Sequence, residues 1–544
     1  MKSRHSMLIT ALTLFAALAV PVRLAAQDKH DQKPKHHHYK LVDIGTFGGP
    51  SSYLNAFVDG FSSGVNAHFF SGAQLLNKQG ILAGWADTST SDPFPSFCFN
   101  ADCFVSHAFQ WQDGRVTDLG ALAAGWSSAA TGINDSGQIV GLSQNGVIDP
   151  LIGLPEVRAV LWQNGQIVDL GTEGGNQSVA LAVNNHGQIA GLALNAIPDP
   201  FSIYDLINYN SSNGTQTRAV LWDEDGGAQD LGTLGTGLDA YAQIVNERGQ
   251  VTGWSYTNST SNSTTGLPTF HPFLWEKGKG MQDLGSLGGT LAAAVNGLNE
   301  RGQVVGATTL AGDIIFHPFL WDGKKLIDLG TFGGDNGEAD WVNDAAEVVG
   351  GTEAHSVCPG SGTHTLHAFL WRNGVMEDLG TTDGLSNSEA NFINSRTQVV
   401  GHSFPCDFSI QDAFLWENDS IVDLNTLISH HSAFHLSLPA FINDQGEIGV
   451  FGTLPNADQH ALLLIPCTDN HVDGDGCEEG CDENHPDIEG CDYNLLDAAA
   501  ATRQSPAPVM QERTIPAQRP LRPFGRRGLT FNSGQTGARN AEGR

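Results

Sequence analysis

The sequence predicts an all-β fold, a β-propeller of eight four-stranded blades that is closed by pairing of the N- and C-terminal strands. Three observations predict it. Three short motifs each recur eight times in strict rotation, glycine is abundant at 65 of 544 residues, and the repeats begin and end within a unit. Seven blades, or another β-repeat form, are the alternatives that this pattern leaves open.

The motifs are an apolar pentamer that mostly ends in Trp, the sequence Asp-Leu-Gly or a close variant, and an Asn followed by a stretch similar to Gly-Gln-Val-Val-Gly. The pentamers occupy 107–111, 158–162, 218–222, 271–275, 317–321, 367–371, 412–416 and 460–464. The second motif begins at Asp43, Asp118, Asp169, Asp230, Asp283, Asp328, Asp378 and Asp423. The third has Asn77, Asn134, Asn184, Asn246, Asn299, Asn343, Asn394 and Asn443.

Each unit of about 50 residues therefore holds four short segments rich in β-branched and aromatic residues, which is the size of one propeller blade. Turn sequences such as Asn164-Gly165 separate the segments. The segment before the repeated Asn contains small residues, as at 128–130, and we expect it at the crowded axis.

The ends of the repeat region favour a ring over an open stack. Residues 39–45 supply only the strand with the Asp-Leu-Gly motif, and 460–464 supply the strand that should precede it. The first strand can therefore complete the last blade, whereas an open stack would leave unpaired sheet edges at both ends.

The strings HAFLW, DLGTLGG and IN-x-x-GQVVG, in the variants that this chain carries, resemble the HAF-repeat family, a group regarded as extracellular. The resemblance covers 39–466. It implies secretion and repetition, and it brings no established catalytic residues.

The N-terminus is typical of a secretory signal peptide. Lys2 and Arg4 precede an uncharged run over 6–22, and small residues precede Gln27. A membrane anchor is less favoured because a span needs about 20 apolar residues. We expect a secreted protein, extracellular or periplasmic, with no transmembrane span in the mature chain. The expected segments are a signal peptide (1–26), a His-rich flexible segment (27–38), the propeller (39–466), an acidic disulfide-rich cap (467–495) and a disordered Pro- and Arg-rich tail (496–544).

A formal charge of −32 argues against a nucleic-acid partner, because such a partner requires a basic surface. Eight cysteines in a secreted chain are expected to form disulfides. No Cys-x-x-Cys pair is present, so we do not expect a zinc site. The spacing suggests Cys98 with Cys103, Cys358 with Cys406, and a cluster of Cys467, Cys477, Cys481 and Cys491 whose connectivity stays open.

One stretch of the cap approximates the first half of a calcium-binding loop. Asp469, Asp473 and Asp475 supply oxygen ligands, and Gly474 lies at the sharp turn. Gly480 stands where an EF-hand would have its closing Glu. An acidic cap stapled by disulfides without a metal is the favoured alternative, and Ca²⁺ is the one cofactor that the sequence suggests.

The repeated Asp, Trp and His residues are expected to be structural, because one active site does not need eight copies whereas eight identical turns need eight capping acceptors. Residues 60–64 match a nucleophile-elbow pattern but lack its strand–turn–helix setting. The acids that do not repeat, Asp239, Glu338, Asp340 and Glu389, lie near the expected axial strands, and a catalytic site would use these.

The leading functional hypothesis is a secreted or surface-associated, non-enzymatic propeller. It would bind an unknown partner, such as a cell-wall glycan or a surface protein, through variable loops on one face. The candidate loops are Leu142–Val157, Leu192–Thr217 and Ser255–Thr269. Two alternatives stay open: a glycan-active hydrolase or lyase with carboxylates about 5–10 Å apart in the central channel, and a structural component of an envelope or matrix.

Overall fold

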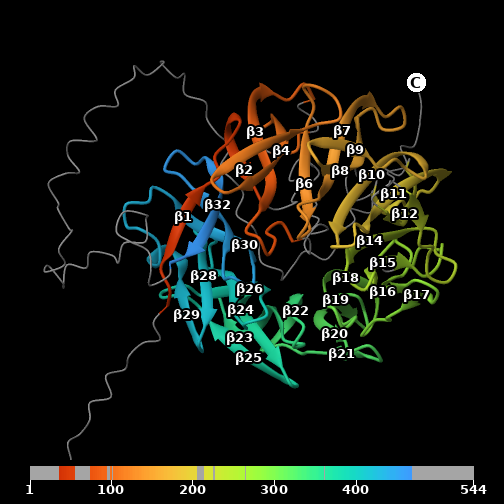
Figure 1. Cartoon of the computed structure of the whole chain (residues 1–544). Coiled ribbons are helices and arrows are strands. Elements are labelled where there is room, and N and C mark those ends of the chain that lie inside the picture. Colours follow the sequence, from red (N-terminus) through yellow and green to blue (C-terminus); the bar gives the residue numbers. More distant parts are fainter. Residues whose placement is uncertain are drawn as a thin grey trace, which may run out of the picture. The chain divides into compact units, whose positions relative to one another are not determined.

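The described part of the chain consists almost entirely of strands and turns. A computed structural model describes residues 36–467 apart from 55–73, 95–97, 101, 205–213, 224–226, 264 and 361. Within that part, 32 strands form eight four-stranded antiparallel sheets. The sheets follow one another around a ring in sequence order (Figure 1). The predicted eight-bladed β-propeller is confirmed.

Seven blades each use four successive strands, and the strand order in the sheet equals the order in the sequence. Blade 1 comprises β2 (Gly48–Tyr53), β3 (Leu82–Ser91), β4 (Phe104–Gln112) and β5 (Arg115–Gly120). Blade 2 comprises β6 (Ser128–Ile133), β7 (Ile139–Ile148), β8 (Pro155–Gln163) and β9 (Gln166–Asp169). Blade 3 comprises β10 (Gly174–Val183), β11 (Ile189–Pro198), β12 (Thr215–Trp222) and β13 (Ala228–Asp230).

The next four blades continue the same pattern. Blade 4 comprises β14 (Ala240–Val245), β15 (Val251–Tyr256), β16 (Phe270–Glu276) and β17 (Gly280–Asp283). Blade 5 comprises β18 (Gly288–Leu298), β19 (Val304–Leu310), β20 (Phe316–Trp321) and β21 (Leu326–Asp328). Blade 6 comprises β22 (Gly333–Val342), β23 (Val348–Val357), β24 (His364–Arg372) and β25 (Val375–Gly380). Blade 7 comprises β26 (Asn387–Ile393), β27 (Val399–Phe404), β28 (Asp412–Glu417) and β29 (Ser420–Asp423), followed by the short 3-10 helix η1 (Leu424–Thr426).

Blade 8 closes the ring with strands from both ends of the described chain. It contains β30 (His435–Ile442), β31 (Ile448–Thr453) and β32 (Gln459–Pro466), and β1 (Tyr39–Asp43) forms its outer edge. The pairing of β1 with β32 is antiparallel and runs from Tyr39 opposite Pro466 to Asp43 opposite Leu462. The predicted closure by the first strand is confirmed.

Alternating strand direction gives the ring two different faces. The short turns that join the first strand of a blade to the second, and the third to the fourth, lie on one face, which we term the turn face. The connections from the second strand to the third, and the crossings between blades, lie on the opposite face, which we term the loop face. The turn-face connections are short in every blade except blade 1, where residues 54–81 join β2 to β3, whereas the loop-face connections differ in length throughout.

Buried aromatic and small residues hold the blades together. Six of the seven repeated Trp side chains are at most 8% exposed, and Trp371 is half-buried. The Gly of the third motif allows close strand approach: a Cβ on Gly141 would lie 2.1 Å from the carbonyl oxygen of Ala129, and a Cβ on Gly401 would lie 2.1 Å from that of Glu389. A side chain there would force the first two strands of the blade apart.

Two of the expected disulfides are present, Cys98–Cys103 and Cys358–Cys406. Cys467 is also disulfide-bonded. Cys477, Cys481 and Cys491 lie outside the described residues, as do the expected signal peptide, nearly all of the cap and the tail. In the described ranges, no helix has the length and apolar character needed to cross a membrane.

Candidate functional site

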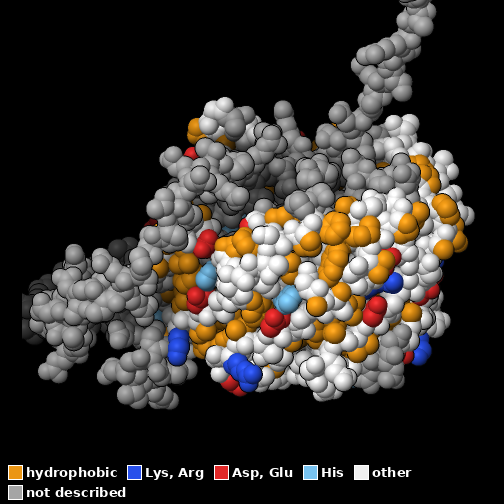
Figure 2. Space-filling view, turned by 90° about the horizontal axis from the view of Figure 1, so that it is seen from above, with side chains coloured by type: hydrophobic (Ala, Val, Ile, Leu, Met, Phe, Trp, Pro, Cys, Tyr) orange, Lys and Arg blue, Asp and Glu red, His pale blue; other side chains and the backbone are white. Residues whose placement is uncertain are grey.

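The repeated Asp residues are turn caps, as predicted. In each of the eight blades the Asp carboxylate accepts a hydrogen bond of 2.7–2.8 Å from the backbone N–H two residues later. Five of them also pair with the repeated His of the neighbouring strand at 2.8–3.0 Å. On the face shown in Figure 2, His side chains lie beside acidic ones. These residues fasten the outer strands and do not form a catalytic set.

Burial and hydrogen bonding have opposite effects on the pKa of the capping carboxylates. Burial alone would raise the pKa of Asp118, but the hydrogen bonds that it accepts from His107 and from the Gly120 N–H outweigh burial and lower it. The same balance lowers the pKa of Asp283, where His271 is the partner. These carboxylates are therefore ionised at neutral pH, which suits a capping acceptor.

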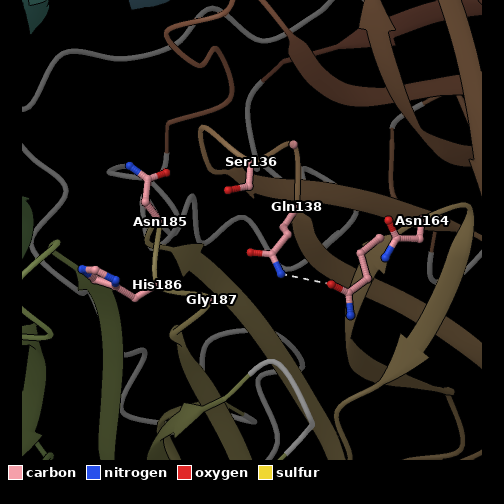
Figure 3. A pocket seen from close by; sticks show the side chains of 8 residues that line it. Ser136, Gln138, Asn164, Asn185, His186 and Gly187 are labelled. Atoms are coloured by element: carbon pink, nitrogen blue, oxygen red, sulfur yellow. Dashed lines mark hydrogen bonds between the residues drawn. The ribbon is translucent and has the colours of Figure 1, made fainter.

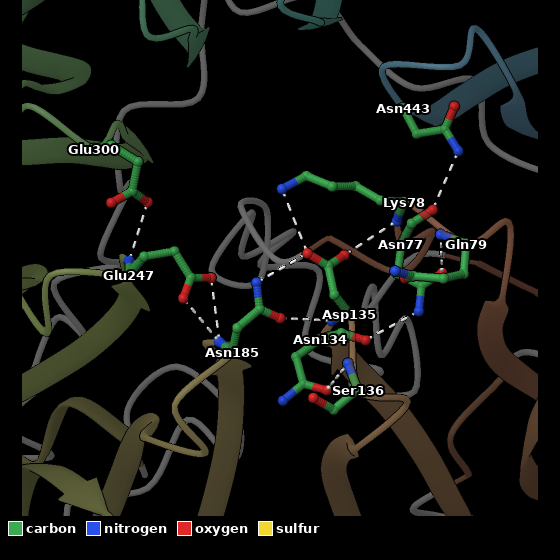
Figure 4. A network of polar contacts seen from close by, with 10 residues as sticks. All are labelled: Asn77, Lys78, Gln79, Asn134, Asp135, Ser136, Asn185, Glu247, Glu300 and Asn443. Atoms are coloured by element: carbon green, nitrogen blue, oxygen red, sulfur yellow. Dashed lines mark hydrogen bonds and ion pairs between the residues drawn. The ribbon is translucent and has the colours of Figure 1, made fainter.

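The repeated Asn residues form a closed circle of hydrogen bonds. Each side-chain Nδ2 donates to the backbone oxygen of the corresponding Asn in the next blade, and the eighth bond, from Asn443 to Asn77, closes the circle at 3.1 Å (Figure 4). The other seven bonds measure 2.9–3.2 Å. Each Asn Oδ1 also accepts backbone N–H groups of its own turn, as Asn134 does from Ser136 and Gln138. This circle ties the blades together around the axis.

The residue after each of these Asn residues adds a second layer of contacts between blades. The Asp135 and Glu247 carboxylates accept backbone N–H groups from Lys78 and Asn185, and Glu300 accepts from Glu247 (Figure 4). Burial raises the pKa of Glu300, although the hydrogen bond from Glu247 opposes this. Because these carboxylates are engaged with backbone donors, we assign them a structural role.

Three of the four non-repeated acids converge on the axis of the propeller, as the catalytic alternative requires. Glu338 and Asp340 lie on β22, and Glu389 lies on β26 of the next blade. The Asn296 side chain on β18 joins them: its Nδ2 lies 2.5 Å from Glu338 Oε1 and 3.4 Å from Asp340 Oδ1. Both carboxylates therefore reach one amide nitrogen.

A histidine completes this group, which we term the axial acid cluster (Asn296, Glu338, Asp340, Glu389 and His402). His402 Nε2 on β27 lies 4.0 Å from Glu389 Oε2. Its Nδ1 is 3.3 Å from Asn391 Oδ1. Burial lowers the pKa of His402 to about 4, so the ring is neutral at pH 7 and does not compensate the carboxylates.

The three acids of the cluster have raised pKa values. Burial raises the pKa of Glu338 to about 7, although its hydrogen bond with Asn296 opposes the shift. Burial, and then the charge of Glu338, raise the pKa of Glu389 to about 8. Burial and both neighbouring carboxylates raise the pKa of Asp340 well above its usual value. The axial acid cluster therefore holds three carboxyl groups that cannot all be ionised at the same time.

Asp239 lies apart from this cluster and pairs with another acid. It is fully buried before β14, and its oxygens accept hydrogen bonds from the Ile203 and Thr217 N–H groups at 2.7 and 3.1 Å. Burial and the charge of Asp199 raise its pKa well above the usual range. The pair fastens the connection between β11 and β12.

A polar recess of about 340 Å³ lies on the turn face between blades 2 and 3. Figure 3 shows the side chains that line it. They come from the first turn of each of the two blades and from the second turn of blade 2: Ser136, Gln138, Gln163, Asn164, Asn185 and His186.

The loop face carries nearly all of the exposed large aliphatic side chains. Of the eight such side chains in the described residues, only Val375 lies on the turn face. The other seven lie at the ends of second strands or in the connections to the third strands of five blades: Val147, Ile148, Leu151, Ile197, Ile314, Val357 and Ile410. Two of the three candidate loops named from the sequence contribute to this set, and Ser255–Thr269 does not.

No described group of three or more His, Cys, Asp or Glu residues is arranged to hold a metal ion. Asp469, Asp473 and Asp475 lie outside the described residues, so calcium binding stays a prediction. Residues 60–64 also lie outside the described residues. The sequence pointed to the axial acids because they interrupt the repeat. It did not point to Asn296, His402 or the recess, because their roles depend on contacts between blades.

Comparison with known proteins identifies no family for the chain. No family model and no curated protein matches the sequence, so the HAF-repeat resemblance stays a prediction. Among solved structures, the β-propeller domain of the trilobed protease from Pyrococcus furiosus is similar at 8% identity and a TM-score of 0.37, with 63% of this chain and 94% of that chain covered. A puromycin-hydrolysing peptidase of Mycobacterium tuberculosis is similar at 9% identity and a TM-score of 0.37, with 80% and 56% covered. These values carry no argument about function.

Proposed function

We propose that this chain is a secreted, non-enzymatic β-propeller that binds a protein partner through its loop face. The observation that carries the proposal is the concentration of exposed aliphatic side chains there. Ile314 is 79% exposed, Ile197 is 55% exposed and Leu151 is 53% exposed. Exposed aliphatic groups that gather on one face favour a protein interface, because their burial is favourable by about 1.5–3 kcal/mol each.

Aliphatic side chains also favour a protein over a glycan as the partner. Val, Leu and Ile offer neither hydrogen-bond donors nor flat rings to a sugar, whereas they pack well against apolar side chains of a protein. Secretion is supported by the leader-like sequence at 1–26, by the HAF-repeat resemblance and by the disulfides Cys98–Cys103 and Cys358–Cys406.

The axial acid cluster by itself does not carry the hydrolase alternative. Its raised pKa values would suit a general acid, and Asp340 and Glu389 are half-buried, but Glu338 is 6% exposed and His402 is 7% exposed. A hydrolase must bring its acid within hydrogen-bond reach of a substrate oxygen. The cluster instead joins blades 5, 6 and 7 to one another.

Photo-cross-linking tests the proposal. A photoreactive amino acid at Ile314 on the loop face is expected to capture one protein from an envelope preparation of the source cells. The same residue at Val375 on the turn face, which is 64% exposed, is the matched control and should capture none. Equal capture from both faces, or from neither, contradicts the proposal.

The captured protein then allows an affinity measurement. With the purified partner, the double variant Ile197→Asp/Ile314→Asp should weaken binding at least tenfold, because two apolar contacts become charged. Val375→Asp should change the affinity less than twofold. Two results together would reject a protein partner on this face: the bound material is polysaccharide rather than protein, and the double variant binds it as tightly as the natural protein does.

A further inference from the structure

The recess between blades 2 and 3 is lined by uncharged side chains, whereas the chain as a whole is acidic. Although the formal charge is −32, the polar side chains that line the recess are two Gln, two Asn, one Ser and one His. Gly137 and Gly187 complete the lining. Its chemistry is that of neutral hydrogen-bonding groups.

Part of this lining is held in place by the fold. Gln138 Oε1 accepts a hydrogen bond of 2.6 Å from Asn134. Gln138 Nε2 donates to Gln163 Oε1 at 3.0 Å, which is the dashed line in Figure 3. Asn185 Nδ2 donates to Asp135 Oδ2 at 2.9 Å, and its Oδ1 accepts from the Asp135 N–H at 2.7 Å. These amides therefore have fixed orientations, which lowers the entropy lost when a ligand binds.

The other polar groups of the lining are available to a ligand. Within the described residues, the Ser136 hydroxyl, the Asn164 amide and the His186 ring make no hydrogen bond to another side chain or to the backbone, and all three residues are exposed. They offer donors and acceptors next to the ordered amides. A ligand with several hydroxyl groups could form hydrogen bonds with donors and acceptors of the recess at the same time.

This neutral lining is not a general property of the repeat. At the corresponding junction of blades 4 and 5, Lys279 forms an ion pair with Glu276 at 2.6 Å, and Arg248 donates to the Glu300 backbone oxygen at 3.2 Å. At the junction of blades 7 and 8, Glu417 accepts from Gln398 at 2.7 Å and lies 3.2 Å from His36. These two junctions thus carry charged side chains, whereas the lining of the recess between blades 2 and 3 is uncharged.

We propose that the recess between blades 2 and 3 binds a neutral saccharide. A charged ligand would find no counter-charge among the lining side chains, and an apolar ligand would leave their amides without hydrogen bonds. A neutral sugar presents hydroxyl groups that both donate and accept. The volume of about 340 Å³ lies at the small end of ligand sites, which corresponds to one or two sugar units. The site lies on the face opposite the aliphatic loops and does not depend on them.

Isothermal titration calorimetry on the full chain tests this site. The probes are glucose, galactose, mannose, N-acetylglucosamine and their β-1,4-linked disaccharides, with glucuronate and spermidine as charged comparators. At least one neutral sugar is expected to bind at millimolar concentration or below, and the comparators should not bind. No binding by any neutral sugar, or equal binding of the charged comparators, would overturn the proposal.

Matched variants locate the binding. The double variant Ser136→Ala/Asn164→Gly removes two of the available groups, and Gly retains the positive φ of 53° at position 164. It should weaken sugar binding about tenfold. The control Gln445→Ala/Asn373→Gly makes comparable changes at equivalent turn positions of other blades, where Asn373 has φ 54°. Equal loss in both variants, or in neither, would place the sugar elsewhere.

Discussion

Removal of β1 is expected to destabilise the whole propeller. Without residues 36–45, β32 becomes an unpaired edge and the buried side chains of Leu462 and Leu464 lose the cover of Tyr39, which is 2% exposed. The lost burial and the lost ladder hydrogen bonds together amount to about 5 kcal/mol or more, which is comparable to the total stability of a domain. For a propeller of this length we expect the melting temperature to fall by about 5 °C or more.

A complementation control separates closure from a general effect of truncation. A synthetic peptide of residues 36–45, added in excess, should pair with β32 and restore part of the lost thermal stability. The same peptide with Val42→Pro should fail, because Val42 shares the orientation of Ile44, whose N–H donates to β32, and proline cannot donate that ladder hydrogen bond. If the truncated chain has the same melting temperature as the full chain, β1 does not close the ring.

The variant Glu389→Gln is expected to be more stable than the natural protein at pH 8. The fold keeps Glu389 protonated up to about pH 8, whereas the unfolded chain releases that proton near the usual pKa of 4.5. A raised carboxyl pKa means that the folded state binds more protons, so its stability falls as the pH rises from about 4.5 to about 8. A neutral amide removes this penalty, and we expect a gain of about 1–3 kcal/mol at pH 8.

Chemical denaturation at pH 5 and at pH 8 measures the effect. The natural protein should lose stability between the two values, and Glu389→Gln should lose less of it. Glu173→Gln, a substitution of the same kind on blade 3 outside the cluster, should retain the natural pH dependence. A Glu389→Gln variant that is less stable than the natural protein at pH 8 would mean that the ionised carboxylate has a favourable partner there.

The architecture could be predicted because it is repeated. Eight copies of each motif fix the strand order, and the incomplete units at 39–45 and 460–464 reveal how the ring closes. The capping role of the repeated Asp followed from the same symmetry, because a turn that is repeated eight times needs its acceptor eight times. Local patterns of this kind depend on residues close in the sequence.

Contacts between blades could not be predicted in the same way. The bond from Asn443 to Asn77 joins residues 366 positions apart, and the sequence marks both only as members of one motif. Glu338, Asp340 and Glu389 could be selected because they interrupt the repeat. The contact of Glu338 and Asp340 with the one amide nitrogen of Asn296 depends on the packing of two blades.

A pair of introduced cysteines tests the circular closure most directly. Lys40 on β1 and Ile465 on β32 are directly paired and partly exposed, so Lys40→Cys/Ile465→Cys places two thiols at a separation that suits a disulfide. Under oxidising conditions, peptide mapping by mass spectrometry should find a peptide that links positions 40 and 465 in nearly all molecules. Free thiols at both positions, or a link only between two chains, would contradict the closed ring.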